Sequence, residues 1–172
     1  MEDVRGPDVS REEKLAQMVV QYERMLLHMC YIYLRDRGLA EDATQETFLK
    51  AYKAMPAFRG ECSEKTWLMK IAMNTCRDMT RGSWFRWVDR RVALDMLPEP
   101  ASEAAYRDID ALAQAIGKLP VKYKEVVLLY FYQRMTMKEV AYSLDIAVPT
   151  VSKRIKQACS KLKGMLGKEW DL

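Results

Sequence analysis

The chain contains little of what catalysis usually needs. Its 172 residues include one histidine, His28, so a hydrolase that depends on a histidine base is a poor hypothesis. Neither a phosphate-binding G-x-x-x-x-G-K-[ST] loop nor a dinucleotide-binding G-x-G-x-x-G motif occurs, which leaves no nucleotide site to propose. We therefore expect a protein that is not an enzyme and that holds no cofactor.

Paired metal and disulfide motifs are also missing. The four cysteines form no C-x-x-C pair and stand at Cys30, Cys62, Cys76 and Cys159. We expect reduced and mostly buried thiols. His28 and Cys30 are two neighbouring candidate ligands, which is too few for a tetrahedral zinc site. The sequence therefore predicts no metal.

Long apolar runs are absent as well. No segment approaches the ~18 uninterrupted apolar residues of a membrane-spanning helix, although 49% of the residues are hydrophobic and 30% are charged. This balance favours a folded core with a polar surface. The N-terminal segment "MEDVRGPDVSREEK" is charged throughout and is unlike a signal peptide. We therefore expect a cytoplasmic protein.

Charge is distributed unevenly around a net value of +4. Residues 77–91 hold five arginines and two aspartates, and residues 150–168 hold six lysines or arginines and no acid. Residues 41–46 show the opposite, with three acids and no base. Basic patches indicate nucleic acid, and the acidic patch indicates a different partner.

Strand signals are scarce, and helical periodicity is frequent, so we predict an all-α protein with two small helical domains. A linker that contains Pro98 and Pro100 separates them. The predicted division is a disordered extension over residues 1–10, a first domain over 11–87, the linker over 88–107 and a second domain over 108–172.

Three helices are predicted in the first domain. The first runs from about Leu15 to Leu34 and is broken by Gly38, and the second runs from near Ala40 to before Pro56. The third is capped by Ser63 and continues to about residue 82.

The second domain has the layout of a helix-turn-helix. Thr136 and Glu139 form an S/T-x-x-E capping box, "DIAV" is a tight connection, and Pro149 lies in the first turn of the next helix. That helix has a predicted buried stripe of Val151, Ile155, Ala158 and Leu162. The predicted DNA contacts in the major groove and on phosphates are Thr150, Ser152, Lys153, Arg154, Lys156 and Gln157. The alternative is an ordinary helical pair with a solvated basic face.

The third helix, "TWLMKIAMNTCRDMTR", has two faces at helical spacing. One is apolar, and the other carries Trp67, Asn74 and three cations. An exposed indole can stack on an unpaired base, an amide can bond a base edge, and the preceding loop can receive a flipped base. The predicted single-strand contacts are Phe58, Arg59, Trp67, Lys70, Asn74, Arg77 and Arg81. The alternative is that Trp67 belongs to the core and the cations only solubilise the helix.

The acidic patch lies on the second helix. Its predicted buried stripe is Thr44, Phe48, Ala51, Tyr52 and Met55, and its outer stripe is Asp42, Gln45, Glu46, Leu49 and Lys53. An exposed leucine among acids and an amide suits a protein-docking surface, although a single exposed leucine is common on protein surfaces.

These segments resemble a known family. "AEDATQETFLKAYKAMPAFRG", "TWLMKIAMNTCRD" and "LPVKYKEVVLLYFYQRMTMKEVAYSLDIAVPTVSKRIKQA" are together similar to the extracytoplasmic-function (ECF) group of bacterial RNA polymerase sigma factors, over about residues 12–166. The resemblance implies a non-catalytic polymerase subunit that directs promoter recognition and opening, with a sigma-2-like and a sigma-4-like domain.

The resemblance also implies a role for each set of residues. The partner would be the core polymerase, with its β and β′ subunits. The outer stripe on the second helix would dock on the clamp helices of β′. The single-strand contacts would capture the −10 element, and the last helix would bind the −35 element as a duplex. Members are often held inactive by an anti-sigma factor, commonly at the membrane. Pro149 and Ala147 depart from the family pattern. The DNA-facing residues stand at positions that vary within the family, so the resemblance does not predict the promoter sequence.

Two other hypotheses fit part of the sequence. A conventional helix-turn-helix repressor or activator would act without core polymerase, but it leaves Trp67, Asn74 and the acidic stripe without a role. An enzyme with an appended DNA-binding domain lacks a visible catalytic site.

Overall fold

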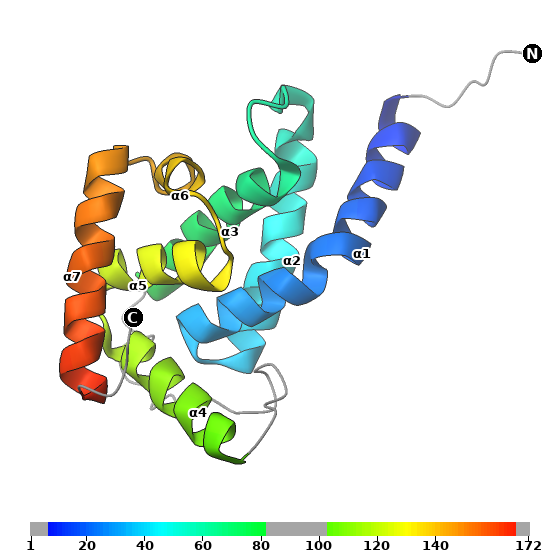
Figure 1. The fold of residues 1–172 in the computed structure, drawn as a ribbon. Coiled ribbons are helices and arrows are strands. Elements are labelled where there is room, and N and C mark those ends of the chain that lie inside the picture. The colour runs from blue at the N-terminus through cyan, green and yellow to red at the C-terminus, as the bar shows by residue number, and fades with distance from the viewer. Residues whose placement is uncertain (1–6, 82–102, 168–172) are drawn as a thin grey trace, which may run out of the picture.

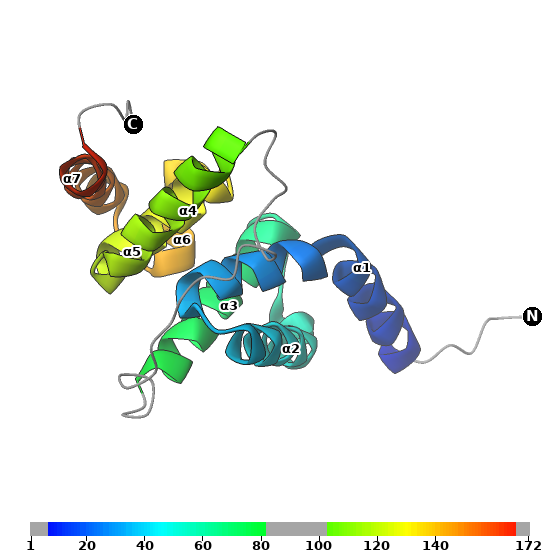
Figure 2. The same cartoon turned by 90° about the horizontal axis from the view of Figure 1, so that it is seen from below.

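Helices make up all of the regular secondary structure in the described part of the chain. The computed structural model describes residues 7–81 and 103–167, with side chains described for 10–81 and 111–167. Helices α1 to α3 form one unit and α4 to α7 a second unit beside it (Figures 1 and 2). The all-α prediction with two helical units is confirmed. Within the described residues, no helix is both long and apolar enough to span a membrane.

The first unit contains α1 (Pro7–Leu34), α2 (Arg37–Ala54), the short 3-10 helix η1 (Met55–Ala57) and α3 (Glu64–Thr80). Helix α1 begins at Pro7, which is earlier than the predicted start, so residues 7–10 are helical although they were assigned to the disordered extension. Residues 1–6 of that extension lie outside the described residues. The start of α1 lies at the outer edge of the molecule (Figure 1), but Lys14 pairs with Glu64 at the start of α3, and Met18 is buried.

The chain breaks between α1 and α2 at Arg35 and Asp36, not at Gly38. Arg35 has a left-handed φ of 56°, and the Asp36 side chain accepts a hydrogen bond from the Leu39 amide at 2.8 Å. Gly38 then lies inside the first turn of α2. The cap therefore determines where the new helix begins, because it satisfies an amide that the first turn leaves free.

A loop over residues 58–63 leads into α3. Gly60 adopts a φ of 73° there, a conformation that favours glycine. The Ser63 hydroxyl accepts a hydrogen bond from the Thr66 amide at 3.1 Å, so the predicted cap is confirmed. Ser63 sets where α3 begins and hence how its side chains face the second unit.

The second unit contains α4 (Glu103–Lys118), α5 (Val121–Val127), η4 (Leu128–Tyr132), α6 (Met137–Leu144) and α7 (Val148–Leu166). Helix α4 begins inside the predicted linker, whose residues 88–102 lie outside the described part. Helix α5 continues into η4, a π-helical turn in which the Gln133 amide donates to the Leu128 carbonyl at 2.9 Å.

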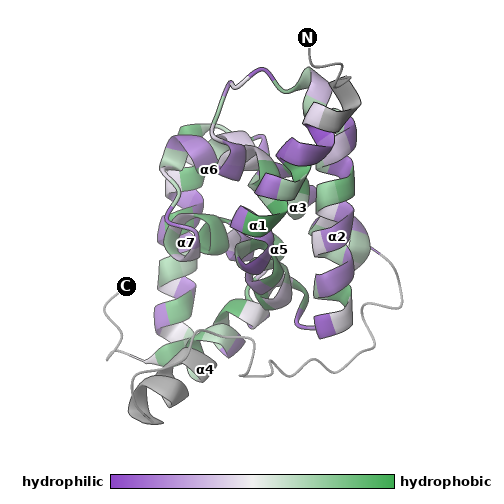
Figure 3. Cartoon of the chain, turned by 90° about the vertical axis from the view of Figure 1, so that its right-hand side faces the viewer, coloured by the Kyte–Doolittle hydropathy of each residue, from purple (hydrophilic) through white to green (hydrophobic). Residues whose placement is uncertain are grey.

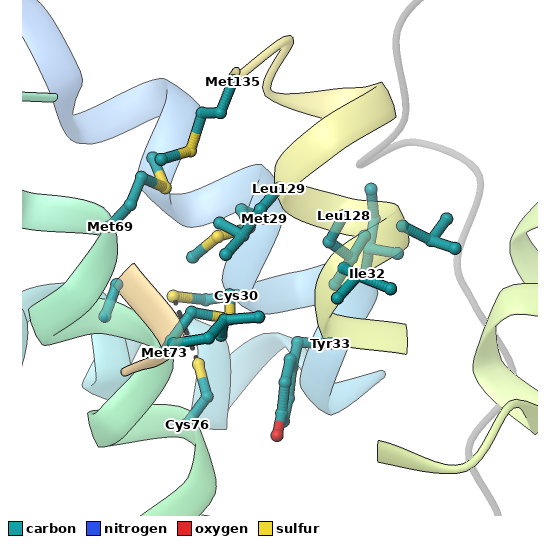
Figure 4. Packing of buried hydrophobic residues seen from close by; sticks show 14 of the residues in the cluster. Met29, Cys30, Ile32, Tyr33, Met69, Met73, Cys76, Leu128, Leu129 and Met135 are labelled. Atoms are coloured by element: carbon teal, nitrogen blue, oxygen red, sulfur yellow. Dashed lines mark hydrogen bonds between the residues drawn. The ribbon is translucent and has the colours of Figure 1, made fainter. Parts of the chain in front are cut away.

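One hydrophobic core extends through both units. Figure 4 shows Tyr33 of α1 and Met73 of α3 on the side of the first unit, facing Leu128 and Leu129 of η4. Leu128 and Leu129 are fully buried. Burial of a leucine contributes ~1.5–3 kcal/mol, so contact between the units is a substantial part of the fold.

Two of the four thiols meet inside this core. The Sγ atoms of Cys30 and Cys76 lie 3.6 Å apart and are buried, whereas Cys62 and Cys159 are half-buried, and all four are free. The hydrogen bond with Cys30 raises the pKa of Cys76, and burial raises it further. Among the described residues, no group of three or more His, Cys, Asp or Glu side chains could hold a metal ion.

Candidate nucleic-acid and polymerase interfaces

The predicted capping box at the start of α6 is present. Glu139 Oε2 accepts a hydrogen bond from the Thr136 amide at 2.7 Å, and the Glu139 amide donates to Thr136 Oγ1 at 3.3 Å. The backbone hydrogen bond from Thr136 holds the pKa of Glu139 below its usual value. The box satisfies two amides of the first turn and sets the start of the helix-turn-helix.

The connection from α6 to α7 is tight. Asp145 ends α6 in the left-handed conformation with a φ of 53°. The Ile146 amide donates a hydrogen bond to the Ala141 carbonyl at 3.1 Å. Helix α7 then starts at Val148, with Pro149 in its first turn and Ala147 at the cap position without a side-chain hydrogen bond. The predicted helix-turn-helix layout is therefore confirmed.

Helix α7 has one buried face and one polar face. All four residues of the predicted apolar stripe are buried: Val151, Ile155, Ala158 and Leu162. Opposite them, Lys153, Lys156 and Gln157 are exposed, and Thr150, Ser152 and Arg154 are half-buried. Gln157 accepts a hydrogen bond from the Tyr123 hydroxyl at 3.1 Å, which orients its amide. This polar face is accessible to a DNA groove.

The outer stripe of α2 is also accessible. Asp42, Gln45 and Lys53 are exposed, Glu46 is half-buried, and Leu49 is 54% exposed. Thr44, Phe48 and Ala51 are buried on the opposite side, while Tyr52 and Met55 are half-buried. Figure 3 shows hydrophilic and hydrophobic residues alternating along α2. The stripe is thus an accessible polar surface with an apolar residue within it, in which Glu46 pairs with Lys50 at 3.8 Å.

Helix α3 departs from the prediction at Trp67. Its side chain is only 7% exposed, and its ring stacks on Phe58 with centroids 4.5 Å apart. The prediction that Trp67 presents an exposed ring to a base is therefore wrong, because Phe58 from the preceding loop packs against it. Phe58 itself is half-buried.

The other predicted single-strand contacts on the first unit divide into exposed residues and residues that pair with the second unit. Arg59 is exposed. Asn74 is exposed and its Oδ1 accepts a hydrogen bond from Arg77 Nη1 at 3.3 Å, and Arg81 is exposed beside Asp78, with its Nη1 3.4 Å from Asp78 Oδ1. By contrast, Lys70 and Arg77 extend to the second unit.

Lys70 forms an ion pair across the two units. Its Nζ lies 2.7 Å from Asp145 Oδ1, at the turn of the helix-turn-helix, and 4.6 Å from the centroid of the Tyr142 ring. The amine therefore has both a carboxylate and an aromatic face as partners. No local pattern indicates that these residues meet, since they lie 75 positions apart.

Arg77 makes the stronger of the two cross-unit pairs. Its Nε and Nη2 donate to the two oxygens of Glu125 at 2.5 and 2.7 Å, a bidentate geometry. Tyr33 also donates to Glu125 Oε1 at 3.1 Å. Glu125 is 2% exposed. The hydrogen bond to Glu125 raises the pKa of Arg77. Burial, together with the charge of Glu125, raises the pKa of Tyr33.

Sequence analysis missed Glu125, although a signal was present. It is a lone acid directly before the apolar run "VVLLYFY", and such a buried carboxylate needs a paired cation. The pattern could have indicated a partner, but not that the partner is Arg77.

The start of α3 is joined to the second unit by polar contacts too. Lys65 Nζ donates to the Gln133 carbonyl at 2.5 Å. The Thr66 hydroxyl donates to Glu139 Oε1 at 3.0 Å, and Ser143 Oγ donates to the Thr66 carbonyl at 3.4 Å. Parts of α5 and α6 therefore cover much of the α3 face that was predicted to bind DNA.

The comparisons with known proteins agree with these two units. Residues 18–86 match the family model of sigma-70 region 2, and residues 109–162 match that of sigma-70 region 4. The chain is 27% identical to the RNA polymerase sigma-H factor of Pseudomonas aeruginosa, covering 87% of this chain and 86% of the relative. It is 28% identical to the ECF RNA polymerase sigma factor SigW of Bacillus subtilis, covering 90% of each.

Solved structures show the same architecture. The chain superposes on CnrH, solved in complex with the cytosolic domain of CnrY, with a TM-score of 0.70 and 26% identity over 90% of this chain and 88% of that one. The fold also matches RpoE from Bartonella quintana, solved with the anti-sigma factor NepR, with a TM-score of 0.74 and 19% identity over 92% and 99% of the two chains.

The chain therefore belongs to the sigma-70 family, within its ECF group of RNA polymerase sigma factors. It functions as an ECF sigma factor, which directs promoter recognition by RNA polymerase and DNA opening at transcription initiation.

Proposed function

We propose that this sigma factor uses three separate surfaces, and that the outer stripe of α2 docks on the β′ subunit of core polymerase. The contacting residues would be Asp42, Gln45, Glu46, Leu49 and Lys53. An exposed leucine surrounded by acids and an amide offers an apolar anchor with a charged rim, which is how protein interfaces are commonly built.

The polar face of α7 binds the −35 element in duplex form. Lys153 and Lys156 are exposed and able to reach phosphates, while Gln157 can bond a base edge. Thr150, Ser152 and Arg154 flank them. This accessible face on a capped helix-turn-helix is the observation that carries the proposal most directly.

The −10 element binds as a single strand at α3 and its preceding loop. Asn74 and Arg59 are exposed, and Arg81 continues the line of cations. Lys70 and Arg77 join them only after the units separate, because both are paired with acids of the second unit. Trp67 acts through Phe58, by holding the loop in place.

We place the sigma-2-like domain over α1 to α3 and the sigma-4-like domain over α4 to α7, with the linker between them. In this assignment the chain is a non-catalytic, cytoplasmic subunit. An anti-sigma factor would hold it inactive, since a protein of this fold, RpoE, was solved in complex with the anti-sigma factor NepR.

Reconstituted transcription tests this function. The purified chain is mixed with core polymerase and a library of genomic fragments, and transcription starts are mapped. We expect a stable complex with core polymerase and a set of new start sites that share sequence upstream. A chain that binds duplex DNA but forms no complex with core polymerase would be a conventional regulator, and the proposal would fail.

A further inference from the structure

We propose that Tyr123 fixes the side-chain amide of Gln157, so that Gln157 selects guanine rather than adenine in duplex DNA. The inference rests on the proposed function of α7 and deepens it, because it names a positioning residue and the base edge that this residue selects. Tyr123 lies in α5, outside the helix-turn-helix of α6 and α7. It is not among the DNA contacts predicted from the sequence.

The Tyr123 side chain is held between two helices. It is 7% exposed, and the Nζ atoms of Lys122 and Lys161 lie 5.0 and 5.6 Å from the centroid of its ring. A packed ring of this kind has little freedom to change rotamer. Its hydroxyl donates a hydrogen bond to Gln157 Oε1 at 3.1 Å, across 34 positions of the chain. The hydroxyl therefore fixes the direction in which Oε1 points.

This hydrogen bond determines which groups Gln157 can offer to DNA. The amide oxygen and nitrogen diverge from the same carbon, so the nitrogen and its two N–H donors point away from Tyr123. An unrestrained glutamine binds adenine with both atoms, because its oxygen accepts from N6 while its nitrogen donates to N7. With its oxygen directed to α5, Gln157 presents donors only.

Guanine is the base that matches a donor. Its edge in the major groove presents two acceptors, N7 and O6, whereas adenine places the N6 donor beside N7. An amide N–H that faces adenine N6 would oppose two donors, and a donor left unpaired in an interface is costly. The preference of Gln157 for guanine thus follows from the orientation of its amide and not from its residue type alone.

Gln157 also lies within the expected DNA footprint. Lys153 stands one helical turn before it and Lys161 one turn after it, on the same side of α7, and Lys156 is adjacent. All four side chains are exposed. Lysines on both sides can bind phosphates and hold the helix in register, which leaves the uncharged amide between them to contact a base.

Tyr123→Phe is the diagnostic variant, because it keeps the packed ring and removes only the hydroxyl that donates to Gln157. Tyr130→Phe is the matched control, since Tyr130 is a half-buried tyrosine of η4 whose ring lies edge-on against Phe131. Gln157→Ala identifies the base pair that Gln157 contacts. Gln157→Glu offers acceptors only, so it should prefer cytosine, whose N4 is a donor.

Base preference is measured with the full-length chain, alone and with core polymerase, on a randomised duplex library. Bound duplexes are sequenced, and the position at which Gln157→Ala loses its preference is assigned to Gln157. There we expect the wild type to favour guanine over adenine roughly tenfold. Tyr123→Phe should reduce this ratio to about twofold or less. Its other base preferences and its salt slope should not change, and Tyr130→Phe should behave as the wild type.

Three results would overturn the inference. One is a guanine preference that Tyr123→Phe leaves unchanged, and another is a wild type that favours adenine at the position assigned to Gln157. The third is duplex selection in which no position responds to Gln157→Ala. Failure of the proposed function gives a different result, since the wild type would then form no complex with core polymerase, and the chain alone would still report its base preference.

Discussion

Helices α3 and α7 each carry a row of cations, and the two rows differ in their exposure and in their pairing with acids. On α7, Lys153 and Lys156 are exposed to solvent. On α3, Lys70 and Arg77 are paired with acids from the other unit. The same residue types therefore form an open surface in one unit and part of the interface between units in the other.

A basic helix face is therefore not by itself a free DNA-binding face. The face is free only where no other part of the chain places a carboxylate within contact distance of its cations. Glu125 does so for Arg77 from within α5, whereas Lys153 and Lys156 stay exposed. Four predictions test this contrast, in order of decreasing effect.

Arg77→Ala should destabilise the fold far more than a similar change on α7. Glu125 would remain buried without its cation, which costs about 3 kcal/mol. Lys153→Ala should change the free energy of unfolding by less than about 0.5 kcal/mol, because Lys153 is exposed. Urea unfolding of the two variants gives both values. Equal stability of the two would mean that the α3 cations are as free as those of α7.

Leu49→Ala should weaken core polymerase binding by roughly tenfold, or ~1.4 kcal/mol, since part of a buried leucine contact would be lost in the complex. The stability of the free chain should not change, because Leu49 is exposed. Val20→Ala is the matched control, as Val20 is an 88% exposed apolar residue on α1. A similar loss with Val20→Ala would show that the effect is not specific to the docking stripe.

Thr136→Ala and Ser63→Ala compare the caps of the two units. Each should cost about 1 kcal/mol at neutral pH. The pKa of Glu139 is lowered in the fold, so its contribution is present above its ordinary value of 4.5 and is lost as the pH falls through the folded value. Thr136→Ala removes the hydrogen bond from the Thr136 hydroxyl to Glu139 Oε2 at 2.9 Å. The cost of Thr136→Ala should therefore shrink in acid, while that of Ser63→Ala stays constant. Unfolding curves across the pH range measure the two costs. A parallel decrease of both costs in acid would contradict this assignment.

Lys156→Ala should have the smallest effect. If Lys156 contacts one phosphate, its loss lowers the slope of log affinity against log salt by about 0.9. Lys118→Ala, an exposed lysine in the last turn of α4, should leave the slope unchanged. Titrations of duplex DNA at several salt concentrations provide the slopes, and an unaltered slope for Lys156→Ala removes it from the DNA contacts.

Much of the fold could be predicted from local patterns. The buried stripe of α7, the capping box at Thr136 and the Ser63 cap depend on residues three or four positions apart, and the structure has them all. The predicted break at Gly38 is wrong, because the Asp36 side chain caps α2 and starts the helix before Gly38.

The site was harder to predict, because helical spacing gives a residue's direction on its own helix but not what covers it. Trp67 and Asn74 share one predicted face, yet Phe58 covers the indole and Asn74 remains exposed. The partner of Arg77 lies 48 positions away. Such contacts arise from the packing of the units, which no local pattern encodes.

The reactivity of single lysines tests the central contrast most directly. The free chain is treated with a limiting amount of an amine-reactive ester, and the rate at each lysine is measured by mass spectrometry, first alone and then with core polymerase. We predict that Lys156 reacts quickly in both states, and that Lys70 reacts slowly in the free chain and faster on the polymerase. Equal rates for Lys70 and Lys156 in the free chain would contradict the account.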